Sequence, residues 1–239
     1  MNAYFKEIFL SFQGEAIYIG YPQLFLRFCD CNLKCKFCDT DFKRSSHCKI
    51  FYSFFSNRFL KEKNPININQ LKKIISNFKN LKYHSIVLTG GEPLLNADFI
   101  KLFLKNKNKK IFLETNGTLP NELNKIINLM DIISMDIKLN SVSGNNCNYS
   151  IFQDFINIAL RKDLYIKIIV NNKIDFSELE QILKLKIPSN LPIIIQPEMN
   201  KTGKIFIEKN TIIKIIKILE KKYSNIRFIP QIHKILKIR

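Results

Sequence analysis

Short apolar runs alternate along this chain with longer amphipathic stretches, and that alternation limits the fold more than any other feature. Runs rich in isoleucine, leucine, valine and phenylalanine are typical of strands that are covered on both faces of a parallel sheet. We expect strands at residues 23–29, 85–89, 110–114, 132–137, 164–170 and 192–196. We expect helices at residues 68–78, 97–105, 121–128, 152–162, 176–184 and 211–222. Such a βα-repeat chain forms either an open doubly wound sheet or a complete or partial barrel.

The chain is expected to form one domain over residues 1–239, because no linker rich in glycine, serine or proline divides it. Residues 42–64 are the least regular, and we interpret them as an irregular insertion. Asn67 or Asn69 can cap the first expected helix, and Pro120 stands where a first helical turn would start. No apolar run is long enough to cross a bilayer, and residues 1–7 lack a secretory-signal pattern, so we expect a cytoplasmic protein.

The chain is strongly basic, with 38 lysine and arginine residues against 20 acidic ones and a net charge of +18. Only six of the cations are arginine, and the lysines are scattered over the polar faces of expected helices such as 211–222. Surfaces that bind phosphate usually cluster arginine with aromatic residues. We therefore expect a solvated basic surface rather than a nucleic-acid site.

Three of the six cysteines, Cys31, Cys35 and Cys38, lie in a C-x3-C-x2-C loop directly after the first long strand. Three thiolates can hold three irons of a [4Fe–4S] cluster and leave the fourth iron open, which is what a cluster that binds a chelating ligand needs. A structural zinc site requires four ligands, and His47 or Cys48 could supply the fourth, so zinc stays an alternative. We interpret Cys29 as a core residue, and Cys48 and Cys147 as free thiols.

A second motif, T-G-G-E-P at residues 89–93, follows the strand at 85–89. In βα-repeat folds the loops after the strands build the ligand site. Gly90 and Gly91 would expose backbone groups to an amino-acid-like ligand, and Glu92 would accept from its ammonium group. The motif lacks the lysine and hydroxyl of a phosphate-binding loop.

The cysteine loop and the G-G-E-P motif together resemble the radical S-adenosylmethionine (SAM) superfamily. A closer resemblance, to the 7-carboxy-7-deazaguanine synthases, is carried by EIFLSFQGEAIYIGYPQLFLRFCDCNLKCKFCDTDF at residues 7–42. It continues through LTGGEP, ETNGT, SMDIKL, IIQPE and PQIHKIL, and so spans nearly the whole chain.

The resemblance implies a partial (β/α) barrel with a mostly parallel sheet and outer helices. It implies a lyase that converts 6-carboxy-5,6,7,8-tetrahydropterin to 7-carboxy-7-deazaguanine with loss of ammonia, in queuosine biosynthesis. SAM would chelate the open iron and supply a radical that removes a substrate hydrogen and later returns it. The family also implies Mg²⁺, a flavodoxin- or ferredoxin-type reductant and a homodimer.

The same resemblance assigns site residues by position. The cluster ligands, on which catalysis depends, would be Cys31, Cys35 and Cys38, and Thr40 would bind Mg²⁺. The substrate would contact Phe12, Gln13, Gly14, Arg27 and Thr89. SAM would contact Phe37, Cys38, Asp39, Gly91, Ser134, Asp136, Lys138, Gln196, Pro197 and Glu198.

From the residues alone, each of these assignments has a plainer alternative. Arg27, in an otherwise apolar strand, could bind the substrate carboxylate or form an ion pair within the protein. Thr40 could be a turn residue, and the segment Gln13-Gly14-Glu15 could be a mere turn. The role of residues 114–117 stays open.

The sequence departs from the family pattern in two places. Ala16 replaces a usual glycine, which would be tolerated only at negative φ. Asp30 replaces the glycine before the first cysteine; aspartate can adopt the left-handed conformation, and its carboxylate would lie close to the cluster. Some relatives use their C-terminus against the substrate, but residues 231–239 offer no residue that can be transferred by motif.

Two other classes remain open at this point. An activase-type radical SAM enzyme, which acts on a partner protein, shares the cysteine loop and often a D-I-K segment like residues 136–138. It lacks the S-x-Q-G-E pattern before the cysteine strand. The basic charge also allows a zinc-bearing RNA-binding module.

Overall fold

The computed structural model describes residues 1–38, 41–54 and 57–239. Within this part of the chain, ten strands form one sheet in the order β12-β11-β10-β9-β8-β7-β3-β2-β4-β5, and β1 and β6 form a separate pair. The strands are β1 Asn2–Ala3, β2 Phe5–Phe12, β3 Pro22–Phe28, β4 His47–Phe51, β5 Leu60–Lys63, β6 Ile66–Asn67, β7 Ser85–Gly90, β8 Lys110–Thr115, β9 Ile132–Ile137, β10 Asp163–Val170, β11 Ile193–Pro197 and β12 Ile226–Phe228.

Eight α-helices and three short 3₁₀ turns connect the strands in the described residues. They are η1 Ala16–Tyr18, α1 Ile68–Ser76, η2 Pro93–Asn96, α2 Ala97–Phe103, α3 Pro120–Ile126, η3 Ile127–Leu129, α4 Asn140–Ser143, α5 Tyr149–Ala159, α6 Phe176–Lys184, α7 Lys209–Leu219 and α8 Ile232–Ile235. Asn67 caps α1 in a complete capping box with Gln70, and Pro120 opens α3, as the sequence predicts. None of the helices among these residues is long and apolar enough to span a membrane.

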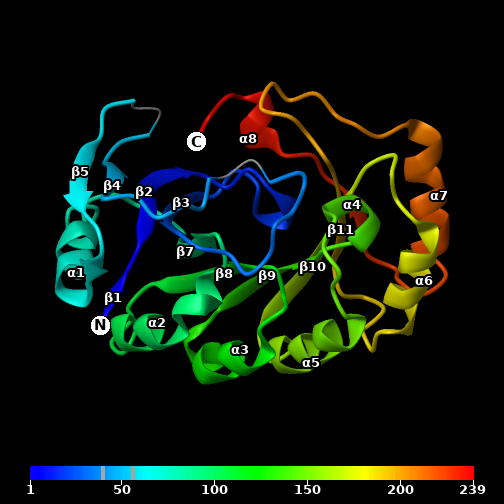
Figure 1. Cartoon of the computed structure of the whole chain (residues 1–239), viewed down its shortest axis with the longest axis horizontal. Helices are drawn as coiled ribbons and strands as arrows, with labels where there is room; N and C mark the ends of the chain where they lie inside the picture. Colours follow the sequence, from blue (N-terminus) through cyan, green and yellow to red (C-terminus); the bar gives the residue numbers. More distant parts are fainter. Residues whose placement is uncertain (39–40, 55–56) are drawn as a thin grey trace.

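The sheet is a curved, open array rather than a closed ring. Seven strands, β3 and β7 to β12, run parallel in chain order, as right-handed βα crossovers produce. β2 pairs antiparallel with β3, and β4 and β5 extend that edge. Helices α1, α2, α3, α5, α6 and α7 follow the outer side of the curve (Figure 1). The predicted partial barrel is confirmed, and all six predicted strands are present within one residue at either end.

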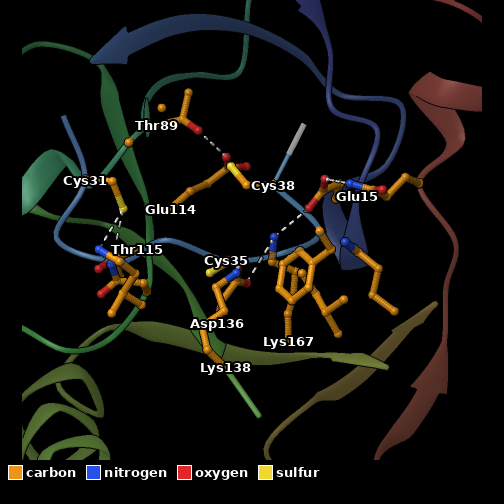
Figure 2. A pocket seen from close by; sticks show the side chains of 18 of the residues that line it. Glu15, Cys31, Cys35, Cys38, Thr89, Glu114, Thr115, Asp136, Lys138 and Lys167 are labelled. Carbon is orange, nitrogen blue, oxygen red and sulfur yellow. Dashed lines mark hydrogen bonds and ion pairs between the residues drawn. The ribbon is translucent and has the colours of Figure 1, made fainter. Parts of the chain in front are cut away.

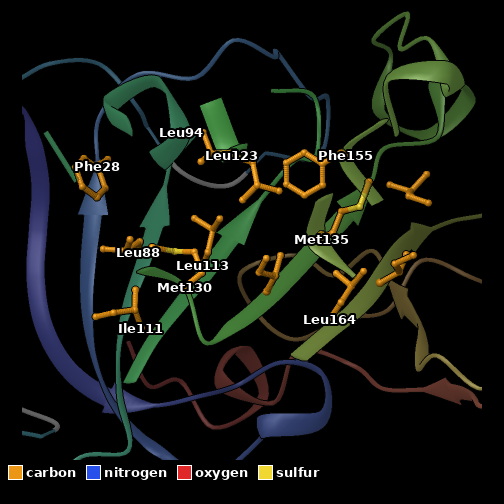
Figure 3. Close-up of a cluster of buried hydrophobic side chains, with 14 of the residues drawn as sticks. Phe28, Leu88, Leu94, Ile111, Leu113, Leu123, Met130, Met135, Phe155 and Leu164 are labelled. Atoms are coloured by element: carbon orange, nitrogen blue, oxygen red, sulfur yellow. The ribbon is translucent and has the colours of Figure 1, made fainter. Parts of the chain in front are cut away.

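Both faces of the sheet are covered, which explains the continuous apolar runs. Side chains such as Leu88, Leu113 and Leu164 point outward and pack against Leu123 and Phe155 of the helices (Figure 3). Alternate residues point inward and form a second, smaller cluster at the amino ends of the strands. This inner cluster contains Phe9, Ala16, Phe25, Phe51, Val87, Phe112, Ile132, Tyr165 and Ile194. It closes the floor of the barrel and leaves the carboxyl ends of the strands for polar residues.

Two expectations differ from the structure. The segment 42–64 is not irregular throughout, because β4 and β5 form an antiparallel pair that extends the sheet. Ala16 does not keep negative φ but lies at +55°, in the left-handed region. This conformation costs an alanine about 1–2 kcal/mol. The Ala16 side chain is buried in the inner cluster, and burying a methyl group returns about 0.8 kcal/mol of that cost.

Candidate active site

On the inner face of the sheet, the apolar residue that belongs to the inner cluster is followed, two positions later in the same strand, by a polar residue. Phe25 is followed by Arg27, Val87 by Thr89, and Phe112 by Glu114; Tyr165 and Ile194 are likewise followed by Lys167 and Gln196. Side chains two apart on a strand share a face, so these polar residues form a layer directly above the apolar floor. The strand register sets Arg27 beside Thr89 and Lys167 beside Asp136.

A first cavity, here the cysteine cavity, opens above this layer and beneath the cysteine loop (Figure 2). Most of the residues predicted to hold the cluster and SAM line it together. They are Cys31, Cys35, Phe37, Cys38, Gly91, Asp136, Lys138, Gln196 and Glu198. Ser134 and Pro197 are buried, and neither is among the described residues that line this cavity. Asp39 and Thr40 lie outside the described residues.

A second cavity, here the tail cavity, adjoins the first. All five residues predicted to contact the substrate line it: Phe12, Gln13, Gly14, Arg27 and Thr89. The C-terminal segment supplies further lining residues that no motif had indicated, namely Gln231, His233, Ile238 and Arg239. Ser11 Oγ donates to the Arg239 carbonyl at 2.6 Å, which ties this segment to β2.

Five residues border both cavities and so form a shared wall: Glu15, Arg27, Thr89, Glu114 and Gln231. Within it, Glu114 accepts from Gln13 Nε2 at 3.0 Å and from Thr89 Oγ1 at 2.6 Å. Arg27 donates through Nε to Glu7 at 2.8 Å and lies over the ring of Phe9. The ion pair considered as an alternative for Arg27 is therefore present, yet the residue still lines both cavities.

An alternating chain of charges lines the cysteine cavity (Figure 2). Glu15 accepts from Gln231 Nε2 at 2.6 Å and pairs with Lys167 Nζ at 2.5 Å. Lys167 also lies 3.2 Å from Asp136 Oδ1, and Asp136 Oδ2 pairs with Lys138 at 2.8 Å. The Lys167 side chain is only 5% exposed. Together these contacts connect the C-terminal segment to the cysteine cavity.

The ion pairs hold both Glu15 and Lys167 in their charged forms. Burial favours the neutral form of each group, but the attraction between them and their other partners outweighs it. The pKa of Glu15 is consequently far below the ordinary carboxyl value, because Lys167 and His233 stabilise the anion. The pKa of Lys167 is far above its ordinary value, because Asp136 and Glu15 stabilise the cation.

Replacing the central cation tests this network. Lys167→Met should lower the free energy of unfolding by about 3 kcal/mol or more, because two buried carboxylates lose their shared partner. The lowered pKa of Glu15 means that its stabilising contribution is present above about pH 4.5 and is lost as the pH falls below it. Chemical denaturation across acid pH should therefore show a steeper loss of stability for the wild type than for Lys167→Met.

Exposed Lys173 provides a matched control, since Lys173→Met removes one positive charge without touching the network. The double variant Glu15→Gln/Lys167→Met should lose less stability than the sum of the two single variants. Strict additivity would mean that the pair contributes no interaction energy.

The prediction for Glu92 needs correction. Glu92 does not face a ligand: it is fully buried and accepts from Leu94 N, Thr115 Oγ1 and Asn116 N. The predicted ammonium acceptor is thus wrong, because Glu92 instead ties the loops after β7 and β8 together. Asp30 adopts φ +63°, as its residue type permits, and its carboxylate pairs with Arg44 at 2.8 Å.

The backbone at G-G-E-P approaches the cysteine loop closely. A Cβ on Gly91 would lie 1.6 Å from the carbonyl oxygen of Asp30, so only glycine fits there. Glu92 N donates to that same carbonyl at 2.9 Å. The motif thus acts by holding the residue before the first cysteine of the loop.

The residues that line the cysteine cavity fit a [4Fe–4S] cluster with a chelating ligand. Three thiols on one loop can each bind a separate iron. Among the residues described, no three cysteine, histidine or acidic side chains converge on a single metal-ion position. Across the cavity, Gln196 is 1% exposed and its Oε1 has no hydrogen-bond partner within the described chain. A buried orphan acceptor at a cavity wall suits a ligand with a donor group.

Glu15, Glu114 and Lys167 were missed as site residues. Two of them could have been found from a sequence pattern. In this pattern, a charged residue stands two positions after an apolar residue of a buried strand and therefore points to the same face of the sheet. Glu114 in KIFLE and Lys167 in LYIKIIV both match it. The remaining thiols, Cys29, Cys48 and Cys147, are buried.

Comparison with known proteins is consistent along the whole chain. The family model described as the Radical SAM superfamily matches residues 27–185. The 7-carboxy-7-deazaguanine synthase of Archaeoglobus fulgidus is 33% identical, over all of this chain and all of its own length. That of Geobacter sulfurreducens is 30% identical over 98% of this chain and 97% of its own length.

A solved structure agrees with the fold. The crystal structure of QueE from Escherichia coli superposes with a TM-score of 0.57 and covers 98% of this chain and 95% of that chain. Its sequence identity is 20%, so this likeness concerns the arrangement of the strands and helices.

Proposed function

Because this chain belongs to the 7-carboxy-7-deazaguanine synthases of the radical SAM superfamily, we propose that it converts 6-carboxy-5,6,7,8-tetrahydropterin to 7-carboxy-7-deazaguanine with release of ammonia. This is a step of queuosine biosynthesis. The observation that carries the proposal is the pair of cavities with a shared wall. One contains the three cysteines and the other contains the residues predicted to contact the substrate.

The cysteine cavity is proposed to hold the cluster and SAM. Cys31, Cys35 and Cys38 would bind three irons, and Gln196 would bind the SAM molecule through its orphan oxygen. Bound together, the cluster and SAM supply a radical that removes a hydrogen atom from the substrate and later returns it. Asp136 and Lys138 neutralise each other at the cavity wall, so they can donate to and accept from SAM without leaving a net buried charge.

The tail cavity is proposed to bind the pterin. Arg27 is anchored through Nε by Glu7, which aims the rest of its guanidinium group into the cavity for the substrate carboxylate. Gln13 donates its two amide N–H groups to Gln23 and Glu114 and so holds Glu114 in place, and the Glu114 carboxylate presents further acceptor sites for the polar edge of the ring. The shared wall would place the substrate next to the cysteine cavity.

Mg²⁺ at Thr40, a reductant of the flavodoxin or ferredoxin type and a homodimer remain predictions. The exposed side chains of Lys34 and Lys36, within the cysteine loop, and of Lys43, shortly after it, support an acidic reductant, because they make this surface positively charged. The single domain over residues 1–239 and the cytoplasmic location also stay predictions.

Anaerobic turnover tests the proposed function. The reconstituted protein is mixed with 6-carboxytetrahydropterin, SAM, Mg²⁺ and a strong reductant, and the products are followed by mass spectrometry. We expect 7-carboxy-7-deazaguanine, with SAM regenerated because the hydrogen atom is returned. Omitting Mg²⁺ tests the magnesium prediction in the same assay.

Two results would contradict the proposal. Cleavage of SAM without conversion of the free pterin, but with activation of a partner protein, would favour an activase-type enzyme. A colourless protein with stoichiometric zinc and no iron would remove both enzyme functions.

A further inference from the structure

The segment between β9 and α5 supports the cysteine loop from one side. Lys36 N donates to the Ser143 carbonyl at 2.8 Å, and Lys34 N donates to Asn145 Oδ1 at 3.0 Å. These two backbone groups flank Cys35. The middle cysteine is thus held against residues 143–145, which are more than 100 positions away in the chain.

Asn145 also contacts the cysteine itself. Its Nδ2 donates to Cys35 Sγ at 3.2 Å, well within the range for a sulfur acceptor. At Cys31 the corresponding contacts are longer, 3.5 Å from Leu33 N and 3.9 Å from Asn116 Nδ2. The Asn116 amide in addition donates to Asn32 Oδ1 at 2.8 Å. The Asn145 amide is therefore closer to the sulfur of Cys35 than the Asn116 amide is to the sulfur of Cys31.

A buried carboxylate fixes the segment that carries Asn145. Glu178, in α6, is 8% exposed and accepts from Asn140 N at 2.6 Å and from Ser141 N at 3.0 Å. It also accepts from the hydroxyl groups of Ser141 and Tyr149. Asn145 N in turn donates to Ser143 Oγ at 3.2 Å. The amide of Asn145 is thus held in place by two successive sets of hydrogen bonds.

We propose that Asn145 is a positioning residue for the cluster, which raises its reduction potential by donating a hydrogen bond to the Cys35 thiolate. A donor to a ligating sulfur withdraws negative charge from it and stabilises the reduced, more negative cluster. Reduction precedes cleavage of SAM, so this bond would ease the first electron transfer. The inference rests on the cluster of the proposed function but not on the identity of the substrate.

The test is a redox titration of the anaerobically reconstituted holoenzyme, followed by electron paramagnetic resonance. Asn145→Ala removes the donor, and its midpoint potential should shift to a more negative value than that of the wild type. Asn145→Asp keeps the shape of the side chain and the oxygen that accepts from Lys34 N, but it loses the N–H group that donates to Cys35 Sγ. Its midpoint potential should therefore shift in the same direction. Iron content is measured for each variant.

The exposed neighbour Asn146 provides matched controls. Asn146→Ala should leave the midpoint unchanged, and Asn146→Asp measures the effect of an added negative charge alone. Equal shifts for Asn145→Asp and Asn146→Asp, or an unchanged midpoint in Asn145→Ala, would overturn the proposal. It would also be overturned if both Asn145 variants bound no iron while the Asn146 variants did, since Asn145 would then only support the loop.

The titration separates this inference from the proposed function. A shifted midpoint in a protein that cleaves SAM but does not convert the pterin would uphold the role of Asn145 and contradict the proposed reaction. Normal product formation by the wild type, with an unchanged midpoint potential in Asn145→Ala, would uphold the proposed reaction and contradict the role of Asn145.

Discussion

Replacing Cys35 with alanine should abolish iron incorporation and SAM cleavage together. Two thiolates leave one more iron of the cluster without a protein ligand, and the remaining Cys31 and Cys38 sit at the two ends of the loop. Iron content, the visible absorption of the cluster and the release of 5′-deoxyadenosine measure the loss. We expect 5′-deoxyadenosine to fall to background, at least about 10³-fold below the wild type.

Cys48→Ala is the control for this variant. Cys48 is a buried thiol in β4 that lines neither cavity in the described part of the chain. It should keep its iron and its activity, with only the modest loss of stability that a small core truncation causes. Retention of a full cluster by Cys35→Ala would show that the C-x3-C-x2-C loop is not the cluster site.

Replacing Arg27 with alanine should uncouple SAM cleavage in the cysteine cavity from conversion of the substrate in the tail cavity. The cluster should form and SAM should still be cleaved, while product formation should fall by about 10²–10³-fold, because a charge-assisted contact to the substrate carboxylate is lost. Glu7 would not be left alone by this change, since Arg239 Nε lies 3.7 Å from its other oxygen. The measurement is the ratio of 7-carboxy-7-deazaguanine formed to SAM cleaved.

Arg27→Lys keeps the charge but not the planar fork, so it should restore only part of the activity. Arg227→Ala, on the exposed face of β12, controls for the loss of one arginine. Normal turnover by Arg27→Ala would mean that the substrate lies elsewhere than in the tail cavity.

Six of the seven parallel strands, β3 and β7 to β11, could be predicted from the sequence because they are covered on both faces, whereas the short β12 was not predicted. Their long apolar runs have no other place in a folded chain, and β9 begins and ends where it is predicted to. The strand β5 escaped prediction for the opposite reason. β5 has the sequence LKEK, which is largely exposed and is a strand only because it pairs with β4.

The candidate site shows the same division. Residues close together in the chain, such as the three cysteines and the G-G-E-P motif, could be identified from their spacing. The function of Glu92 could not be identified in this way. Its carboxylate accepts from two backbone N–H groups and one hydroxyl group and does not face the cavity, and this depends on how the loops after β7 and β8 meet. The αL conformation of Ala16 likewise follows from packing and not from residue type.

By itself, then, the amino-acid sequence determined the βα-repeat architecture and the family, and it predicted the chemistry of the cysteine loop. Each of these depends on residue types at short spacing or on a periodic pattern. Only the tertiary structure decided which charges face one another. Lys167 and Glu15 are 152 positions apart, and Asn145 and Cys35 are 110 apart. Contacts at such separations depend on the register of strands and on loops that meet only once the sheet has formed.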